Sequence, residues 1–314
     1  MLSLRDFIIL ERQQAIIEGG NAVHADKIPA EIAPILYKEI EEKVKKAYPD
    51  VDMAALGSLG KKPAGQTTGD IDIAITIEGE DNIRKLINEL WPGYEIADRS
   101  AKGVVSWAYP WEKNGKSGKA QIDFMSKNNM DWTKWRYDSP DYTKGESKYK
   151  AAVKDYILRG VLSSIPVKDA ENEFFDDGKP KKKWRHTFTV DGIFKKLESY
   201  EGKNGKYKAT ADTVINELVS DDPKEVMKFI FPNGYENSDF KSAESIWKAI
   251  HSDKWVWGDE ALNYAEENFF KNYVYLREKK KKDGTVVMCS LKGADSIIID
   301  PKDFPCKIYK PEEK

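Results

Sequence analysis

The chain has 314 residues, 40% of them hydrophobic and 33% charged, with a formal net charge of −2. This composition excludes an intrinsically disordered chain, and the near-neutral charge disfavours a protein that binds long nucleic acid without sequence preference, which requires many phosphates to be neutralised. No apolar run approaches the roughly 18 residues of a membrane span and the first residues lack a secretion-signal pattern, so we expect no membrane partner and a cytoplasmic location.

Helical and strand patterns alternate in the first half of the chain. Apolar residues at helical spacing predict helices over 4–18, 29–47 and 81–90. Short apolar or alternating runs predict strands over 51–56, 70–77, 94–97, 103–109 and 119–125. Asn114-Gly115 predicts a hairpin turn between the last two strands.

A domain boundary is predicted near residue 165, where Ser164-Ile165-Pro166 ends a helix expected over 146–162. The following residues predict a hairpin over 171–190 and a strand-like tail over 285–299. Between these, helices are predicted over 193–200, 211–219, 223–229, 243–251 and 259–282. We therefore expect two domains, over 1–165 and 166–314, the second of them mainly helical.

The most informative stretch begins with the turn Leu56-Gly57-Ser58 and ends, after eleven intervening residues, in the strand that starts Asp70-Ile71-Asp72. Side chains alternate faces along a strand, so Asp70 and Asp72 share one face while the isoleucines point into a core. Two adjacent carboxylates repel each other. A divalent cation such as Mg²⁺, which prefers oxygen ligands, removes that repulsion.

Asp123 is the third candidate ligand. It is the only acidic residue of the predicted strand 119–125 and stands between the apolar Ile122 and Phe124. An isolated carboxylate in such a strand is costly to bury unless it is paired or binds a cation. We expect an antiparallel neighbour relation to bring Asp123 beside Asp70 and Asp72.

These residues together resemble the nucleotidyltransferase superfamily of the DNA polymerase β type. The signature of that superfamily is an apolar residue, Gly, Gly or Ser, a spacer of about this length, and Asp-x-Asp between apolar residues, with a third carboxylate on a later strand. The resemblance covers roughly the first half of the chain. It implies an α+β fold, in which a catalytic domain over 1–165 has a mixed sheet flanked by helices. The mainly helical domain over 166–314 would then be an acceptor-binding or accessory domain.

The resemblance also implies roles for the site residues. Asp70 and Asp72 would hold two Mg²⁺ ions, with Mn²⁺ as a possible substitute, and Asp123 would ligate one ion and help to deprotonate the attacking hydroxyl. Ser58 and the amides around Gly57 would hold the phosphates of a nucleoside triphosphate. Lys61 and Lys62 of the spacer are further candidate phosphate contacts. So is Lys150, chosen from Lys148, Lys150 and Lys154 on the predicted helix.

Three functional interpretations remain open from the sequence. The first is an enzyme that transfers a nucleoside monophosphate to an acceptor hydroxyl, with an RNA end or a nucleotide favoured over a protein or small molecule. The second is a catalytically silent nucleotidyltransferase-like module used for binding or assembly. The third is a nucleic-acid-binding protein that uses the basic stretch 179–185.

Overall fold

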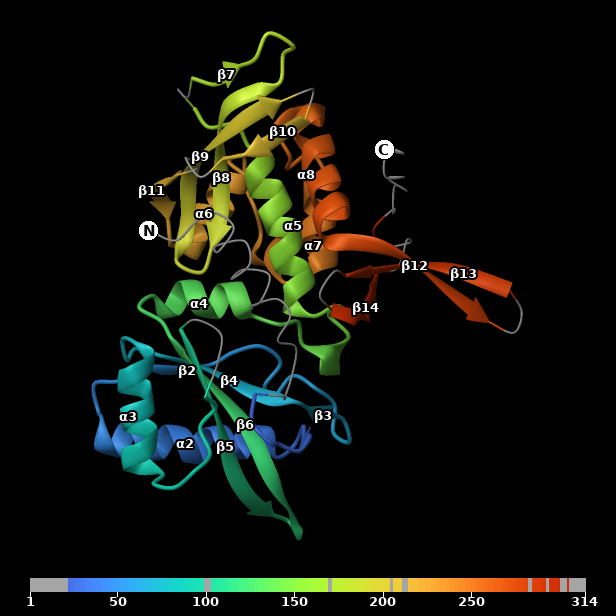
Figure 1. The fold of residues 1–314 in the computed structure, drawn as a ribbon. Coiled ribbons are helices and arrows are strands. Elements are labelled where there is room, and N and C mark those ends of the chain that lie inside the picture. The colour runs from blue at the N-terminus through green and yellow to red at the C-terminus, as the bar shows by residue number, and fades with distance from the viewer. Residues whose placement is uncertain are drawn as a thin grey trace. The chain divides into compact units, whose positions relative to one another are not determined.

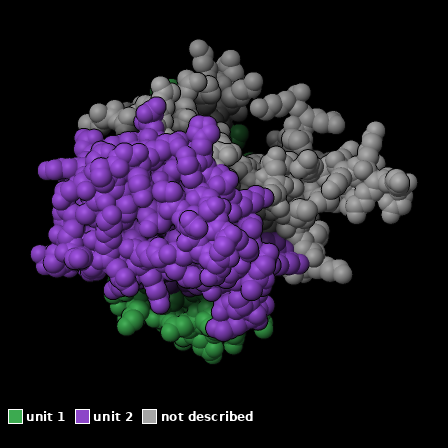
Figure 2. Space-filling view, turned by 90° about the horizontal axis from the view of Figure 1, so that it is seen from below, with its two compact units in different colours: residues 1–9, 152–314 green, residues 10–151 purple. Residues whose placement is uncertain are grey.

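The computed structural model describes residues 22–98, 103–168, 171–203, 206–210, 214–281, 284–291, 294–299 and 304. The helix expected over 4–18 lies outside these residues. The chain forms two compact units that divide between Ala151 and Ala152. In chain order, the first unit ends at Ala151 and is purple in Figure 2, and the second unit starts at Ala152 and is green. The prediction of a mixed α+β chain is confirmed.

The first unit is built on a four-stranded sheet. Its strands lie in the order β2 (Met53–Ala55), β4 (Asp70–Ile75), β6 (Lys116–Ser126) and β5 (Val104–Lys113). The central pair β4–β6 is parallel and the two outer pairs are antiparallel, so the sheet is mixed. The predicted turn between β5 and β6 is confirmed, and both Asn114 and Gly115 have positive φ angles. A separate small sheet pairs β1 (Ile28–Pro29) with β3 (Thr67–Thr68).

Helices α2 (Ala33–Ala47) and α3 (Glu80–Leu90) cover one face of this sheet (Figure 1). Both carry apolar residues at helical spacing, and the acidic first turn of α3 suits the positive end of its helix dipole. They pack on the isoleucines of β4 and on the apolar residues of β6 and β5. The buried side chains of this core include Leu36, Ile40, Val44, Ile71, Ile73, Ile75, Ile83, Leu86, Ile87, Trp107, Ile122 and Phe124.

The opposite face of the sheet carries the aspartates and is covered in part by helix α4 (Met130–Tyr137) (Figure 1). Ala74 of β4 packs there with Met130 and Tyr137 of α4. The sequence pattern did not predict α4, because its apolar residues do not repeat at helical spacing. The helix is instead started by Asn129, whose side chain accepts a hydrogen bond of 2.9 Å from the Trp132 amide.

The second unit begins with helix α5 (Ala151–Ser164), earlier than the boundary expected at 165. This helix packs closely against α8 (Gly258–Tyr273). A Cβ atom at Gly160 would lie 2.8 Å from the Ala265 carbonyl oxygen, and the rings of Tyr156 and Tyr273 stack 4.3 Å apart. Helix α5 therefore belongs with the later elements and not with the sheet that precedes it.

Strands make up much of the second unit, so the expectation of a mainly helical domain is wrong. Its main sheet has the order β10 (Lys206–Ala209), β9 (Gly192–Lys203), β8 (Pro180–Thr189), β7 (Glu173–Phe174), and β11 (Val214–Ser220) also pairs with β9. A second sheet joins β12 (Val274–Lys281), β13 (Gly284–Leu291) and β14 (Ala294–Ile299). The helices α6 (Pro223–Ile230) and α7 (Ala243–Ile250) lie where the sequence predicted them.

Two predicted helices are strands in the structure, over 193–200 in β9 and over the described part of 211–219 in β11. Ile193 and Leu197 are four residues apart, a spacing that places side chains on one face of either a helix or a strand. The spacing of the apolar residues therefore does not distinguish a helix from a strand here. Pairing of β9 with β8 along the register from Lys182↔Ser199 to Thr189↔Gly192 decides the conformation. The helix expected over 259–282 likewise ends at Tyr273, where β12 begins.

No helix among the described residues combines the length and the apolar character needed to cross a bilayer.

Candidate active site

Asp70, Asp72 and Asp123 are brought together by the central strand pair of the first unit. In the register of β4 and β6, Asp72 lies directly opposite Asp123 and Asp70 lies opposite Gln121. One carboxylate oxygen from each of the three aspartates lies within 4.8 Å of the others. The neighbour relation is parallel, not antiparallel as expected, because α3 and the hairpin strand β5 return the chain so that β6 runs in the direction of β4.

Asp123 is buried, with 7% of its surface exposed, and two neighbours fix its carboxylate. The Gln121 amide donates to both carboxylate oxygens at 3.0 and 3.2 Å, and Ser106 donates a further hydrogen bond. The backbone amide of Ala22 in turn donates to Gln121 Oε1 at 3.1 Å. Sequence reasoning missed Gln121 and Ser106. Gln121 had a readable signal, since it lies two residues before Asp123 and so on the same strand face.

Burial and neighbouring negative charge disfavour the ionisation of Asp72 and Asp123. Burial raises the pKa of Asp123 to about 6, and the Asp70 charge adds to this while the bonds from Ser106 and Gln121 oppose it. Burial and the charges of Asp70 and Asp123 raise the pKa of Asp72 well above its ordinary range. Carboxylate oxygens held close together and partly buried are typical of a group that a divalent cation completes.

The turn at Gly57 lies against the acidic strand. Leu56 donates its amide to the Asp72 carbonyl at 2.9 Å, and Gly57 follows with a φ of 63°. A Cβ atom at Gly57 would lie 3.4 Å from Asp72 Oδ2. The Gly57 amide, which we expected to face phosphates, donates to the Tyr137 carbonyl at 3.2 Å. Ser58 comes next in the turn and is half-buried.

Glycine at position 57 allows a positive φ angle and leaves space beside the Asp72 carboxylate, and replacement by alanine tests both effects. We expect Gly57→Ala to lower the free energy of unfolding by about 1 to 2 kcal/mol because of its left-handed backbone, and to weaken Mg²⁺ binding because the new methyl group contacts the Asp72 carboxylate. Gly65→Ala is the matched control, since Gly65 has a φ of 84° and open space around its Cβ position. Calorimetric Mg²⁺ titration of both variants checks this, and equal Mg²⁺ affinities would contradict it.

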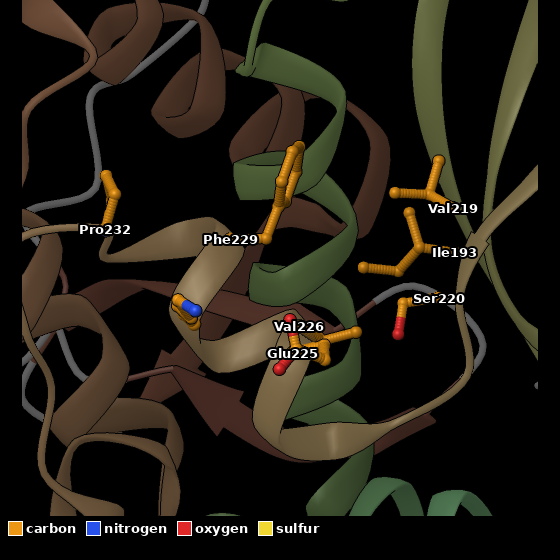
Figure 3. Close-up of a pocket in the computed structure, with 8 residues that line it drawn as sticks. Ile193, Val219, Ser220, Glu225, Val226, Phe229 and Pro232 are labelled. Carbon is orange, nitrogen blue, oxygen red and sulfur yellow. The ribbon is translucent and has the colours of Figure 1, made fainter.

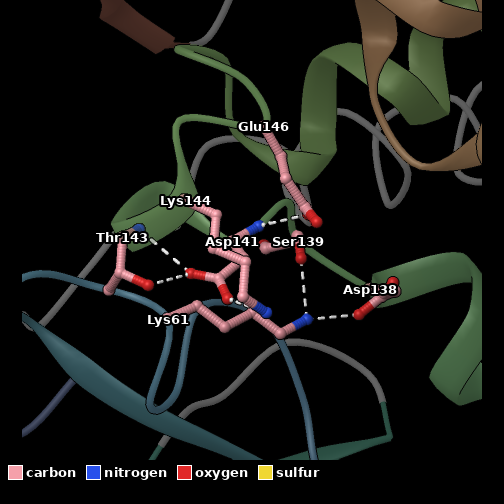
Figure 4. A network of polar contacts seen from close by, with 7 residues as sticks. All are labelled: Lys61, Asp138, Ser139, Asp141, Thr143, Lys144 and Glu146. Carbon is pink, nitrogen blue, oxygen red and sulfur yellow. Dashed lines mark hydrogen bonds and ion pairs between the residues drawn. The ribbon is translucent and has the colours of Figure 1, made fainter.

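The two spacer lysines have different surroundings. Lys61 Nζ pairs with the Asp138 carboxylate and donates to the Ser139 carbonyl at 2.7 Å (Figure 4). Lys62 Nζ donates to the Thr67 carbonyl at 3.1 Å. Burial and the positive charge of Lys150 lower the pKa of Lys62, and the negative charge of Asp70 opposes this. Lys62 therefore interacts with one of the carboxylates and with Lys150, whereas Lys61 is held by the loop after α4.

Lys148 and Lys154, the other two candidate lysines, have different surroundings. Lys148 Nζ lies 5.5 Å from the centre of the Tyr149 ring. Lys154 belongs to α5 in the second unit and is 2% exposed. The charge of Lys150 acts on Lys62, which in turn interacts with Asp70.

The basic stretch 179–185 is largely matched by acidic or aromatic partners within its own unit. Lys182 and Lys181 pair with Glu173 at 2.6 and 3.8 Å, and Arg185 pairs with Glu198 at 3.0 Å. Lys183 lies over the ring of Tyr264. Because these charges are partly compensated, the stretch gives weak support for a nucleic-acid surface.

A cavity of about 290 Å³ lies in the second unit, between the strands β9 and β11 and the helix α6 (Figure 3). Its lining is mainly apolar and consists of Ile193, Val219, Ser220, Glu225, Val226, Lys228, Phe229 and Pro232. This lining has no cluster of carboxylates, histidines or cysteines. Among the described residues, the aspartate cluster of the first unit is therefore the stronger candidate for a reacting centre.

Comparison of the sequence with models of known protein families gives no match. Comparison with curated proteins also gives no match.

Proposed function

We propose that the chain is a metal-dependent nucleotidyltransferase, which moves a nucleoside monophosphate from a nucleoside triphosphate to an acceptor hydroxyl and releases pyrophosphate. The observation that carries this proposal is the cluster of Asp70, Asp72 and Asp123, whose carboxylate oxygens lie within 4.8 Å of one another beside the Gly57-Ser58 turn. The proposed fold of the first unit is accordingly a polymerase β-like palm. Its mixed sheet, with helices on the face opposite the carboxylates, supports that assignment.

The donor set suits Mg²⁺ or Mn²⁺. Hard divalent cations take carboxylate oxygens, and the raised pKa values of Asp72 and Asp123 reflect burial together with neighbouring negative charge, which a cation would compensate. Asp70, Asp72 and Asp123 would hold the metal. When bound, the metal supplies Lewis-acid stabilisation of the charge that develops on the reacting phosphate.

The side chains around the carboxylates have distinct proposed roles. The Ser58 hydroxyl donates to the phosphates, while Lys62 and Lys150 offset their negative charge. Asp123, fixed by Gln121 and Ser106, accepts the proton of the acceptor hydroxyl. The acceptor oxygen then forms a bond to the α-phosphorus as the bond from that phosphorus to the pyrophosphate oxygen breaks. An RNA end or a nucleotide is the favoured acceptor.

Incorporation of α-labelled nucleotide tests this function. Each of the four common ribonucleoside triphosphates is supplied with Mg²⁺ or Mn²⁺ to the full chain, together with total RNA, protein or metabolite pools. We expect label from at least one triphosphate to enter one pool, with stoichiometric release of pyrophosphate. Metal-dependent nucleotide binding without any transfer would instead support the silent-module alternative.

A further inference from the structure

The end of α4 and the loop that follows it contact two groups of the Gly57 turn that the resemblance to nucleotidyltransferases makes candidate phosphate contacts, the Gly57 amide and Lys61. The Tyr137 carbonyl oxygen accepts a hydrogen bond of 3.2 Å from the Gly57 amide. Asp138 and Ser139 hold Lys61 Nζ, through a carboxylate and a carbonyl oxygen respectively. The backbones of Gly57 and Asp138 also form a parallel bridge. Residues 137–139, named here the latch, therefore engage one amide and one ammonium group of the turn.

The residues after the latch hold their shape by their own hydrogen bonds (Figure 4). The Asp141 carboxylate accepts bonds of 3.0 and 2.5 Å from the amide and hydroxyl of Thr143, and it pairs with Lys144 at 2.9 Å. The Asp141 amide donates to Glu146 Oε2 at 2.9 Å. Because this network involves no atom of the Gly57 turn, residues 141–146 can keep their conformation when the latch leaves the turn.

The contacts of the latch are weak enough to exchange. The side chains of Lys61 and Asp138 are 29% and 53% exposed, and ion pairs at such exposure contribute little net stability. A triphosphate carries several negative charges and offers charge-assisted acceptors to the same ammonium and amide groups. It therefore competes favourably with one carboxylate and two carbonyl oxygens.

We propose that residues 137–139 form a nucleotide-displaced latch. Asp138 and the carbonyls of Tyr137 and Ser139 occupy Lys61 and the Gly57 amide in the nucleotide-free protein, and the phosphates of a nucleoside triphosphate take over both groups on binding. The inference rests on the proposed function, because it requires phosphates beside the Gly57 turn. Asp138 is in this scheme a positioning residue that lowers triphosphate affinity by competing for Lys61.

Calorimetric titration with each ribonucleoside triphosphate and with inorganic tripolyphosphate, all with Mg²⁺, tests the latch. We expect Asp138→Asn to lower the Kd of the ligands that bind by about two- to fivefold, the range of an exposed ion pair. Glu146→Gln is the matched control. It removes the same charge from the same loop without touching Lys61, and it should leave the Kd unchanged. In a Lys61→Met background, Asp138→Asn should have no effect.

Hydrogen exchange gives a second readout, in which the Gly57 amide and residues 137–139 should change protection when ligand binds to the wild-type chain. Binding by the wild type with an unchanged or raised Kd for Asp138→Asn overturns the latch alone. An equal decrease in Kd for Glu146→Gln and Asp138→Asn also overturns the latch, since the loss of any negative charge in this loop would then explain the higher affinity. Absence of binding of all these ligands to the wild type overturns the proposed function and the latch together.

Discussion

The double substitution Asp70→Asn with Asp72→Asn is expected to lower nucleotide transfer by about 10³-fold or more while leaving the fold intact. Loss of a single preorganised electrostatic group at a reacting centre typically costs 10²- to 10³-fold, and this variant removes two of the three carboxylates that would hold the metal. The fold should persist, because both side chains lie on the face opposite the isoleucine core and asparagine has almost the same shape.

The measurement is incorporation of α-labelled nucleotide, with circular dichroism and the melting temperature as tests of folding. Asp50→Asn with Asp52→Asn is a matched control, since it removes two carboxylates with the same spacing from exposed positions on the same unit. The control should transfer nucleotide at nearly the wild-type rate. Equal labelling by wild type and by the Asp70/Asp72 variant would rule out the carboxylates as the reacting centre.

The paired aspartates could be predicted because their relation is local. Residues two apart on one strand share a face wherever that strand lies in the sheet, so Asp70 and Asp72 follow from alternation alone. The position of Asp123 depends on which strands are neighbours, which alternation does not determine. The sequence predicted the presence of a strand around Asp123, but the parallel pairing with β4 came only from the structure.

The adjacent lysines illustrate a second limit of the sequence. Lys61 and Lys62 are equivalent in composition and spacing, and nothing in the sequence separates them. Their difference arises from Asp138, which is 77 residues further along the chain and pairs with Lys61 only because α4 ends beside the Gly57 turn. Contacts of this kind depend on the tertiary fold. The same is true of β9 and β11, which are strands where the sequence pattern predicted helices.

The second large effect concerns the stability of the metal-free protein. We expect Asp123→Asn to raise the free energy of unfolding at pH 8 in chelator by on the order of 1 to 3 kcal/mol, because a pKa near 6 in place of about 3.9 corresponds to roughly that penalty for the ionised carboxyl. The Gln121 amide can still donate to the asparagine oxygen, so the substitution leaves this buried partner satisfied.

The pH dependence follows from the same shift. Since the folded-state pKa of Asp123 lies above its unfolded value, the folded protein binds more protons than the unfolded protein between about pH 4 and pH 6. The stability of the wild type should therefore fall as pH rises through this window, and the advantage of Asp123→Asn should grow across it. Denaturant unfolding in chelator at several pH values measures this, with exposed Asp50→Asn as the control for net charge.

Added Mg²⁺ should reduce the stability advantage of Asp123→Asn over the wild type. A cation that binds only the folded state stabilises it by about 2.7 kcal/mol at 100 times its Kd, and the wild type should gain this while Asp123→Asn, with one ligand fewer, gains less. A carboxylate that merely packed in the core would give a different result. Asp123→Asn would then be destabilised at every pH, and Mg²⁺ would shift both proteins equally. If Asp123→Asn stabilises the metal-free protein and reduces its stabilisation by Mg²⁺, Asp123 is a metal ligand whose carboxylate lowers the stability of the metal-free fold.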